Sequence, residues 1–252
     1  MEKQRFTQLD ALSERLASMR PLNAGELKRL REEFLIENTF NSNAIEGNTL
    51  TLRETAMILR EGLTVAGKPL KDHLEAVGHR DAYVYMLSIA DRNQTLTERH
   101  IKEIHSLVLM DDPLNKGVYR GVPVRILGAA HTPPQPYLVA PQMEALMADY
   151  DGMKREHHII EAIAEFHLRF EGIHPFIDGN GRTGRLVMNL ELIKAGYLPV
   201  DIKFADRGRY YACFDDYDGD GKTPDALITL ILGYEIGELE RYIGIGEGAN
   251  LQ

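Results

Sequence analysis

Residues 172–185 read GIHPFIDGNGRTGR, and this stretch predicts a loop that joins two helices. The preceding segment, HHIIEAIAEFHLRFEG at residues 157–172, carries apolar residues at helical spacing, which predicts a helix that ends at the glycine. A second helix is predicted over residues 182–196. The loop between them holds His174, Asp178 and a Gly-Asn-Gly run, so its chemistry decides how the chain is interpreted.

The loop and the helix after it supply the groups that a phosphate site needs. Gly179, Asn180 and Gly181 can turn successive backbone N–H groups into one concavity, because Gly and Asn tolerate positive φ. The start of the following helix adds the positive end of its dipole, which favours phosphate. Arg182 and Arg185 are three residues apart, so they share a helix face and can both reach a polyphosphate.

Two more side chains in this stretch point to catalysis. Asp178 is a hard oxygen ligand of the kind that Mg²⁺ uses when it is held between protein and phosphates. His174 is the group of this stretch that can accept a proton near neutral pH. The joint pattern indicates an enzyme that transfers a phosphate-containing group.

Three weaker patterns compete with this interpretation. The G-x-G-x-x-G spacing at residues 179–184 follows a helical segment, whereas the dinucleotide fingerprint follows a strand. Gly-Lys-Thr at residues 221–223 lacks the earlier glycine of a P-loop. The acidic run at residues 216–221 resembles the opening of a calcium loop, but its twelfth position is Leu227, which favours a solvated acidic turn.

Outside this stretch the pattern is mainly helical, with one exception. Helices are predicted at residues 6–19, from 27, at 51–62 (with Thr51 and Glu54 as a capping box), 70–90, 97–110, 141–155, 206–217 and 225–243. The exception is residues 115–139, where Pro and Gly surround the segments VYRGVPVRI and PYLVA, which predict a hairpin or two short strands. Pro141 is predicted as a first helical residue. The expected fold class is mainly α, a bundle of eight or nine helices with one small β element.

Composition narrows the class of protein. The 252 residues are 44% hydrophobic and 27% charged, with a formal net charge of −9, which disfavours nonspecific nucleic-acid or anionic-membrane binding. The single cysteine, Cys213, excludes a disulfide framework within the chain and suits a reducing compartment. The start MEKQRFTQLD has no apolar signal region, and no apolar run approaches the length that spans a bilayer. We therefore expect a soluble, cytoplasmic protein without direct nucleic-acid or membrane partners.

Residues 174–185, HPFIDGNGRTGR, match the signature H-P-F-x-(D/E)-G-N-G-R-x-x-R of the Fic family at every specified position. GVYR at 117–120 and HTPP at 131–134 also resemble parts of the family's flap. The resemblance covers roughly residues 95–235. It implies the Fic helical bundle with a β-hairpin flap, and a protein adenylyltransferase that moves AMP from ATP onto a Ser, Thr or Tyr hydroxyl of a target protein.

The resemblance also implies a role for each matching residue. His174 would deprotonate the target hydroxyl, and Asp178 would hold Mg²⁺, with Mn²⁺ as an alternative, between the α- and β-phosphates. Transfer of AMP rather than a phosphoryl group is favoured because Arg185 completes the signature. The nucleotide-binding residues would be Gly179, Asn180 and Gly181 as the anion hole, Arg182 and Arg185 at the outer phosphates, and Tyr210 and Tyr211 near the adenine. The flap residues that pin the target backbone as an added strand would be Val118, Tyr119, Arg120, His131, Pro133 and Pro134.

A second family motif lies near the N-terminus. Residues 42–47, SNAIEG, match the inhibitory motif (S/T)-x-x-x-E-(G/N), N-terminal to the core as in class II members. The match implies that Glu46, flanked by Ser42 and Gly47, pairs with Arg185 in the place of the γ-phosphate. ATP would then bind with its α-phosphate misaligned for attack, so the enzyme would be autoinhibited.

The expected domain organisation has three parts: an N-terminal helical region at 1–94 with the inhibitory motif, the Fic core at 95–235, and a C-terminal helix end and tail at 236–252. Two alternatives stay open: an enzyme that removes AMP or transfers another nucleotide from the same site, and a non-catalytic nucleotide-binding module. The segment CFDDYDGDGKTP departs from the usual spacing after the tyrosine pair, which leaves nucleobase selectivity open. The target protein is not identified, and a homodimer is one alternative for the oligomeric state.

Overall fold

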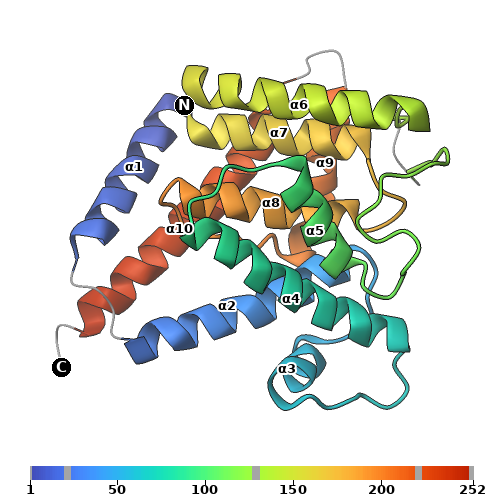
Figure 1. Cartoon of the computed structure of the whole chain (residues 1–252). Coiled ribbons are helices and arrows are strands. Elements are labelled where there is room, and N and C mark those ends of the chain that lie inside the picture. The colour runs from blue at the N-terminus through green and yellow to red at the C-terminus, as the bar shows by residue number, and fades with distance from the viewer. Residues whose placement is uncertain (1, 20–23, 127–130, 219–222, 250–252) are drawn as a thin grey trace.

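The computed structural model describes residues 2–19, 24–126, 131–218 and 223–249, which form ten α-helices and one 3₁₀ helix (Figure 1). The count exceeds the eight or nine helices that the sequence predicted. The helices are α1 (Glu2–Ser18), α2 (Ala24–Ile45), α3 (Leu52–Glu61), α4 (Leu70–Asp91), α5 (Glu98–Val108), α6 (Pro136–Glu156), α7 (Ile159–Ile173), α8 (Asn180–Lys194), α9 (Arg207–Asp218) and α10 (Asp225–Ala249), with the 3₁₀ helix η1 at Phe204–Asp206.

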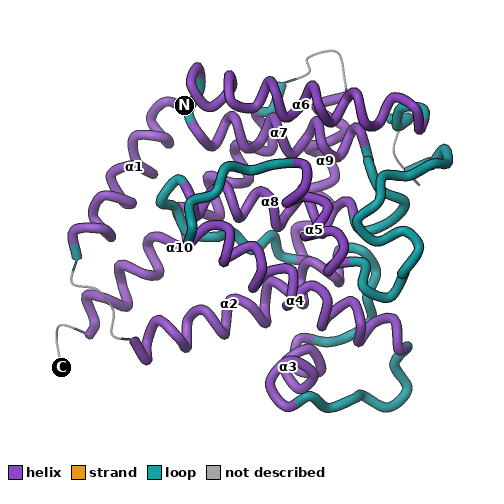
Figure 2. The backbone as a smooth tube through the Cα atoms, viewed as in Figure 1, coloured by secondary structure: helices purple, strands orange, loops and turns teal. Residues whose placement is uncertain are grey.

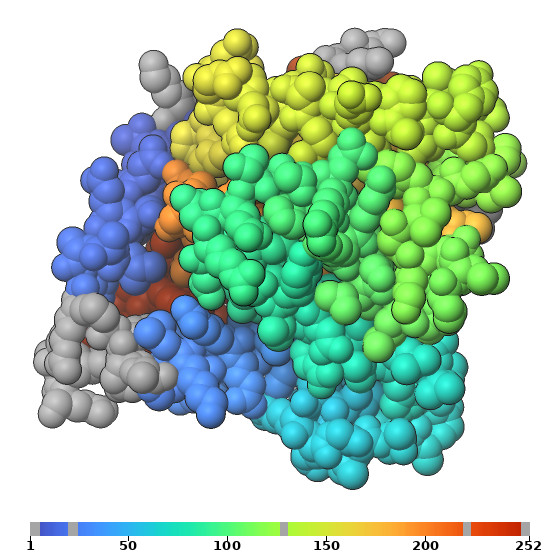
Figure 3. Space-filling view, viewed as in Figure 1, coloured from blue at the N-terminus to red at the C-terminus, as the bar shows by residue number. Residues whose placement is uncertain are grey.

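Helix α8 is the centre of the bundle. Twelve of its fifteen residues are buried, and it packs against α2, α4, α5 and α7. On the face shown in Figure 3, α4, α5, α6 and the loop after α5 form most of the surface. A helix that is apolar on all sides is expected to be buried in a core. Helix α8 is buried in the same way, although its buried residues include arginines and asparagines.

Two apolar cores meet at α8. One core joins α4, α5, α6 and α7, and α8 contributes Leu186 and Leu190 to it. The other joins α1, α7, α9 and α10, and α8 contributes Met188 and Leu192. Because both cores share α7 and α8, the loop between these two helices is held firmly at both ends.

Local signals place several helix ends as the sequence predicted. Thr51 and Glu54 form the predicted capping box at the start of α3, and Gly62 at φ +66° ends that helix. The predicted helices at 70–90 and 97–110 correspond to α4 and α5. The predicted domain boundary at residues 94 and 95 falls in the loop between these helices, and it remains a prediction.

The predicted β element is not found in the described residues, which contain no strand (Figure 2). The predicted strand PYLVA at residues 136–140 is wrong, because these residues form the first turn and more of α6. Pro136 is the first residue of that helix, a position where its missing N–H costs nothing. Pro141 therefore lies inside α6 rather than at its start. Residues 118–126 run without a ladder partner, and residues 127–130 lie outside the described part.

Arg120 explains how this loop is held without strand pairing. Its side chain is buried, and its guanidinium donates to the carbonyl oxygens of Val122, Pro134, Ile173 and His174 at 2.6–3.3 Å. The backbone N–H of Arg120 donates to the carbonyl of Pro175 at 2.9 Å. One side chain thus ties the loop after α5 to the end of α7.

Replacing Arg120 by methionine is expected to lower the free energy of unfolding by about 2 kcal/mol, because several buried carbonyl oxygens lose their donor. Urea unfolding followed by circular dichroism measures the change. Arg53→Met, on the exposed side of α3, is the matched control and should change stability by less than about 0.5 kcal/mol. Equal stability of the Arg120 variant and the control would contradict the anchoring role.

No helix among the described residues combines the length and the apolar character that crossing a membrane requires.

Candidate active site

A cavity of about 650 Å³ opens beside the loop between α7 and α8. Its volume is in the range of small-molecule sites. Predicted site residues from four separate parts of the chain line it together: Glu46, His131, His174, Asp178, Gly181, Arg185, Tyr210 and Tyr211. Arg125, Glu171, Phe214, Asp215 and Tyr217 are among the other lining residues.

His174 ends α7 in an unusual backbone conformation. It is the C-cap residue with φ +49° and ψ +61°, and its N–H donates to the carbonyl of Phe170 at 3.0 Å. The turn directs the imidazole toward the cavity that it lines. Burial is the main cause that lowers the pKa of His174 to about 4, so the ring is neutral near pH 7 and able to accept a proton.

Asp178 lies in the loop with one oxygen fixed. Its Oδ1 atom accepts the N–H of Gly179 at 2.6 Å and lies 3.3 Å from Arg182 Nη2, while Oδ2 lies 3.6 Å from Lys71 Nζ. Burial acts to raise its pKa, but Arg182, the Gly179 N–H and Lys71 together hold the pKa of Asp178 below its usual range. The carboxylate is therefore ionised at neutral pH.

The donor set around Asp178 fits a magnesium ion that is shared with a substrate. Its side chain is half exposed, and no group of three His, Cys, Asp or Glu side chains that could hold a metal occurs among the described residues. Mg²⁺ is commonly held by one or two carboxylates plus substrate phosphates rather than by an all-protein cage. Asp178 is the residue that would hold it here.

Gly179 and Gly181 are glycines for different reasons. Gly179 is the N-cap of α8 with φ +76°, a conformation that L side chains rarely adopt. At Gly181 a Cβ would lie 2.3 Å from Glu46 Oε1, so the carboxylate rests directly on the first turn of α8.

Asn180 was predicted to contribute its backbone N–H to the anion hole, and its side chain closes the loop. Its amide accepts the N–H of Phe176 and donates to the carbonyl of the same residue, both at 2.9 Å, and the residue is buried. Only its backbone N–H remains for the predicted anion hole.

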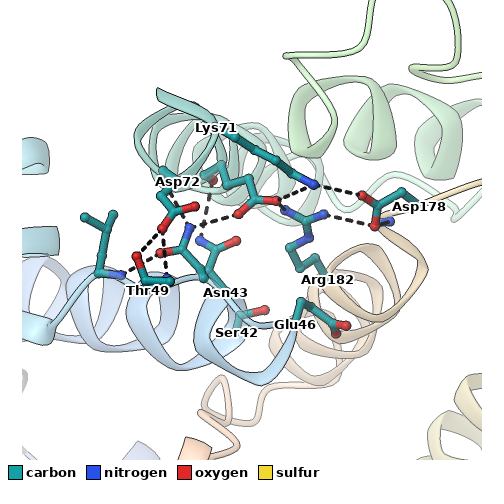
Figure 4. A network of polar contacts seen from close by, with 12 residues as sticks. Ser42, Asn43, Glu46, Thr49, Lys71, Asp72, Asp178 and Arg182 are labelled. Carbon is teal, nitrogen blue, oxygen red and sulfur yellow. Dashed lines mark hydrogen bonds and ion pairs between the residues drawn. The ribbon is translucent and has the colours of Figure 1, made fainter. Parts of the chain in front are cut away.

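The two arginines of the signature lie in different environments. Arg182 is 1% exposed and is not among the residues that line the cavity. Its guanidinium pairs with Glu75 of α4 at 3.0 Å. It also pairs with Asp178 at 3.3 Å (Figure 4). It therefore orients the carboxylate of Asp178 from behind the cavity wall.

Arg185 lines the cavity and meets the segment that ends α2. Its Nη2 atom donates to Glu46 Oε1 at 2.8 Å and to the carbonyl of Ser42 at 2.8 Å, and its Nε atom donates to Ser42 Oγ at 3.0 Å. Burial opposes its charge, but Glu46 raises the pKa of Arg185 above its usual value. Gly47, the residue after Glu46, has φ +96° and turns the chain away from α2.

Tyr210 and Tyr211 both line the cavity but differ in exposure. Tyr210 is buried, and its hydroxyl lies 2.7 Å from His167 Nε2 and 3.5 Å from Arg185 Nη1. Tyr211 is 41% exposed, and its hydroxyl donates to the carbonyl of Ile45 at 3.1 Å. Tyr211 is thus the one that offers an open ring face, while it also contacts the end of α2.

The predicted flap residues divide into inward and outward groups. Tyr119 donates to Glu98 Oε2 at 2.7 Å, and Pro133 is buried, so both serve packing. Val118 is 57% exposed. His131 lines the cavity, with Nε2 at 2.7 Å from the carbonyl of Gly172 and Nδ1 at 3.3 Å from Asp218.

Three residues that the sequence analysis missed support the site. Glu75 binds both Arg182 and Asn48 of the turn after Glu46, at 3.0 and 2.9 Å. His105 of α5 lies 2.9 Å from the carbonyl of Asp178 and accepts the N–H of Gly117 at 2.8 Å. Glu171 lies one helical turn before His174. Of these three residues, Glu171 is the one whose closeness to the site can be inferred from its spacing in the sequence.

Comparison with known families gives one match inside the chain. The Fic/DOC family model matches residues 95–192, which run from the loop before α5 to near the end of α8. The matched range contains His174, Asp178 and both signature arginines, whereas Glu46 and Tyr210 lie outside it.

Curated relatives agree with this match over a longer range. Protein adenylyltransferase Fic from Nematostella vectensis is 39% identical over 212 residues, which cover 81% of this chain and 48% of the relative. The protein of the same name from Culex quinquefasciatus is 36% identical over 218 residues, 84% of this chain and 42% of the relative. The chain therefore spans less than half the length of these relatives.

Solved structures match over nearly the whole chain. A Fic-domain-containing signaling protein from Bacteroides thetaiotaomicron has a TM-score of 0.85 at 29% identity, covering 98% of this chain and 97% of that one. Fic-1 from C. elegans has a TM-score of 0.86 at 26% identity, covering 98% of this chain and 73% of that one.

Proposed function

We propose that the protein transfers AMP from ATP to a hydroxyl group of a target protein, because residues 95–192 match the Fic/DOC family model. The observation that carries the proposal is the convergence of His174, Asp178 and Arg185 on one cavity. A neutral base, an ionised carboxylate and a buried cation are the groups that transfer at a phosphorus atom requires. The sequence relatives named protein adenylyltransferase support the same reaction.

The residues of the predicted signature have defined tasks in this reaction. His174 takes the proton of the target hydroxyl, whose oxygen then attacks the α-phosphorus while pyrophosphate leaves. Asp178 would hold Mg²⁺, which supplies charge neutralisation at the phosphates when bound. Arg185 binds the outer phosphates, and the backbone N–H groups at the start of α8 face the anion. Arg182 and Glu75 keep Asp178 in place.

We further propose that Glu46 inhibits the enzyme from within the same chain. Its carboxylate holds the Arg185 guanidinium at 2.8 Å, so the outer phosphates of ATP compete with it for that cation. The carboxylate also covers Gly181 at the start of α8. A triphosphate bound beside Glu46 is displaced from the geometry for attack, and small displacements cost large factors in rate.

Replacing Glu46 by glycine is expected to raise AMP transfer roughly ten- to a hundredfold, the equivalent of one hydrogen bond to a charged group. The measurement is incorporation of label from α-phosphate-labelled ATP, with Mg²⁺, into proteins of a cell lysate and into the enzyme itself. Mass spectrometry of the labelled products identifies the modified hydroxyls.

Glu61→Gly is the matched control, because Glu61 is an exposed glutamate at the end of α3 and lies outside the cavity. If wild type and Glu46→Gly incorporate label to the same extent, the inhibitory role of Glu46 is contradicted. No label in any variant that binds ATP would contradict the transferase and favour the non-catalytic binding module.

The removal of AMP from a modified protein is a second candidate reaction of this cavity. The Glu46 carboxylate is partly exposed beside Arg185, where it could orient a water molecule. A pre-modified target distinguishes the two reactions: an AMP-removing enzyme releases AMP as wild type and loses this activity in Glu46→Gly.

A further inference from the structure

Glu171 is a buried carboxyl group of the cavity to which the reaction above gives no task. It belongs to the last turn of α7, three residues before His174, and its side chain is 12% exposed. Its Oε2 atom lies 3.9 Å from Nδ1 of His174. Glu171 Oε1 and His174 Nδ1 are both buried and make no hydrogen bond of regular geometry among the described residues, although the backbone of Glu171 also acts on the imidazole and raises its pKa. The unpartnered Oε1 belongs to the same carboxyl group as the Oε2 atom near the ring, and buried polar atoms are costly unless they pair in a working state.

The packing of α8 makes room for this carboxyl group. A Cβ on Gly184 would lie 2.6 Å from Glu171 Oε1 and 2.9 Å from His167 Cε1. Glycine inside a helix costs about 1 kcal/mol relative to alanine, so its use at this point is explained by the close approach of the carboxyl group. Glu46 occupies the equivalent place one turn earlier, against Gly181.

The charges around Glu171 come from three other helices. Glu46 follows the end of α2, Arg185 belongs to α8, and Tyr210 and Tyr211 belong to α9. Burial first, and Glu46 second, raise the pKa of Glu171 to about 8, while burial lowers the pKa of His174 to about 4. Between these values Glu171 is protonated and His174 is neutral, and above pH 8 the carboxylate is free to accept a hydrogen bond.

We propose that Glu171 is the positioning residue for His174: its carboxylate accepts the Nδ1–H of the imidazole and so leaves Nε2 as the base. The proposal rests on the proposed function for the identity of the proton donor. A small side-chain rotation closes the 3.9 Å gap to a hydrogen bond, as free active sites often require. Nε2 takes the proton of the target hydroxyl as the oxygen–phosphorus bond forms and the bond to pyrophosphate breaks. The carboxylate stabilises the imidazolium that results, as in other carboxylate–histidine pairs.

This arrangement gives Glu46 a second effect. Burial first, and the negative charge of Glu46 second, keep Glu171 protonated, and a neutral carboxyl group is a weaker acceptor for the Nδ1–H than a carboxylate. Removal of Glu46 therefore favours the ionised carboxylate, in addition to freeing Arg185.

The first test compares kinetic constants in the Glu46→Gly background. Adding Glu171→Gln, which keeps the shape but removes the charge, is expected to lower kcat about ten- to a hundredfold and leave the KM for ATP within about twofold. The rate of Glu46→Gly should rise with pH as Glu171 loses its proton, and this rise should be absent in the Gln variant. Asp149→Asn, which removes a carboxylate from α6 outside the cavity, is the matched control. An unchanged kcat and pH profile in Glu171→Gln would overturn the proposal.

The second test does not depend on activity. NMR of ¹⁵N-histidine-labelled protein without nucleotide reports which ring nitrogen of His174 carries the proton, and the spectrum of His174→Ala assigns the signals. In wild type the population of the Nδ1–H tautomer should increase as the pH rises through about 8. In Glu46→Gly the same increase should occur at lower pH, and in Glu171→Gln it should be absent. The same tautomer at every pH in wild type would overturn the pairing, and this result needs no variant. The expected tautomers combined with no label transfer by Glu46→Gly would instead contradict the proposed function.

Discussion

Replacing His174 by alanine is expected to lower AMP transfer by roughly 10²–10⁴-fold, the usual contribution of a positioned general base. Among the residues that line the cavity, His174 offers the imidazole whose pKa is lowered to about 4, so nearly every molecule has it in the accepting form at neutral pH. Its carbonyl, held by Arg120, and its N–H, held by Phe170, remain bonded in the variant. The loop should therefore keep its shape while the chemistry is lost.

Because we propose that Glu46 inhibits the reaction, both proteins carry Glu46→Gly in this measurement. Label transfer from α-phosphate-labelled ATP gives the rate, and isothermal titration with ATP and Mg²⁺ gives the affinity, which should change less than about threefold. His157→Ala, an exposed histidine at the end of α6, is the control for the loss of a histidine as such. Transfer that persists at the full rate without His174 would assign the base to another residue.

Replacing Glu75 by alanine is expected to lower the free energy of unfolding by about 3–5 kcal/mol, as removal of one partner from a buried ion pair does. Glu75 and Arg182 are 8% and 1% exposed and lie 3.0 Å apart. Without the carboxylate, the Arg182 charge stays buried with only the half-exposed Asp178 beside it. Asn48, in the turn after Glu46, also loses one of its hydrogen-bond acceptors.

Urea unfolding measures this loss, with Glu33→Ala on α2 as a partly exposed control. The double variant Glu75→Leu/Arg182→Met separates charge from shape. Because replacing both members of a buried pair by apolar residues is often neutral, it should recover most of the lost stability. A loss below about 1 kcal/mol in Glu75→Ala would show that the pair contributes little.

The site could be predicted from the sequence as far as its chemistry is local. His174, Asp178 and Arg185 lie within twelve residues, so loop geometry and helix spacing bring them to one place without knowledge of the fold. The partners of Arg182 could not be found this way, since Glu75 is more than one hundred residues away and its burial depends on how α4 packs against α8. Glu171 was within reach, because a spacing of three places it on the same helical turn as His174.

The helices were predicted well where caps and apolar spacing agree, as at Thr51 and Gly62. The predicted β element is absent from the described residues because β-branched residues next to prolines indicate strands only when a partner strand exists. Val139 instead begins the buried face of α6, which continues at Met143, Leu146 and Tyr150. The loop after α5 finds its hydrogen bonds at the Arg120 guanidinium, a long-range contact that no local pattern displays.

The left-handed backbone of His174 implies a trade-off between stability and chemistry. A helix that ends in this conformation usually does so with glycine, and a residue with a Cβ there costs of order 1 kcal/mol. Glycine at this position would relax the turn and, on folding energy alone, would suit it better. The imidazole at this bend lines the cavity, so under the proposed function the glycine that suits the backbone best would remove the base.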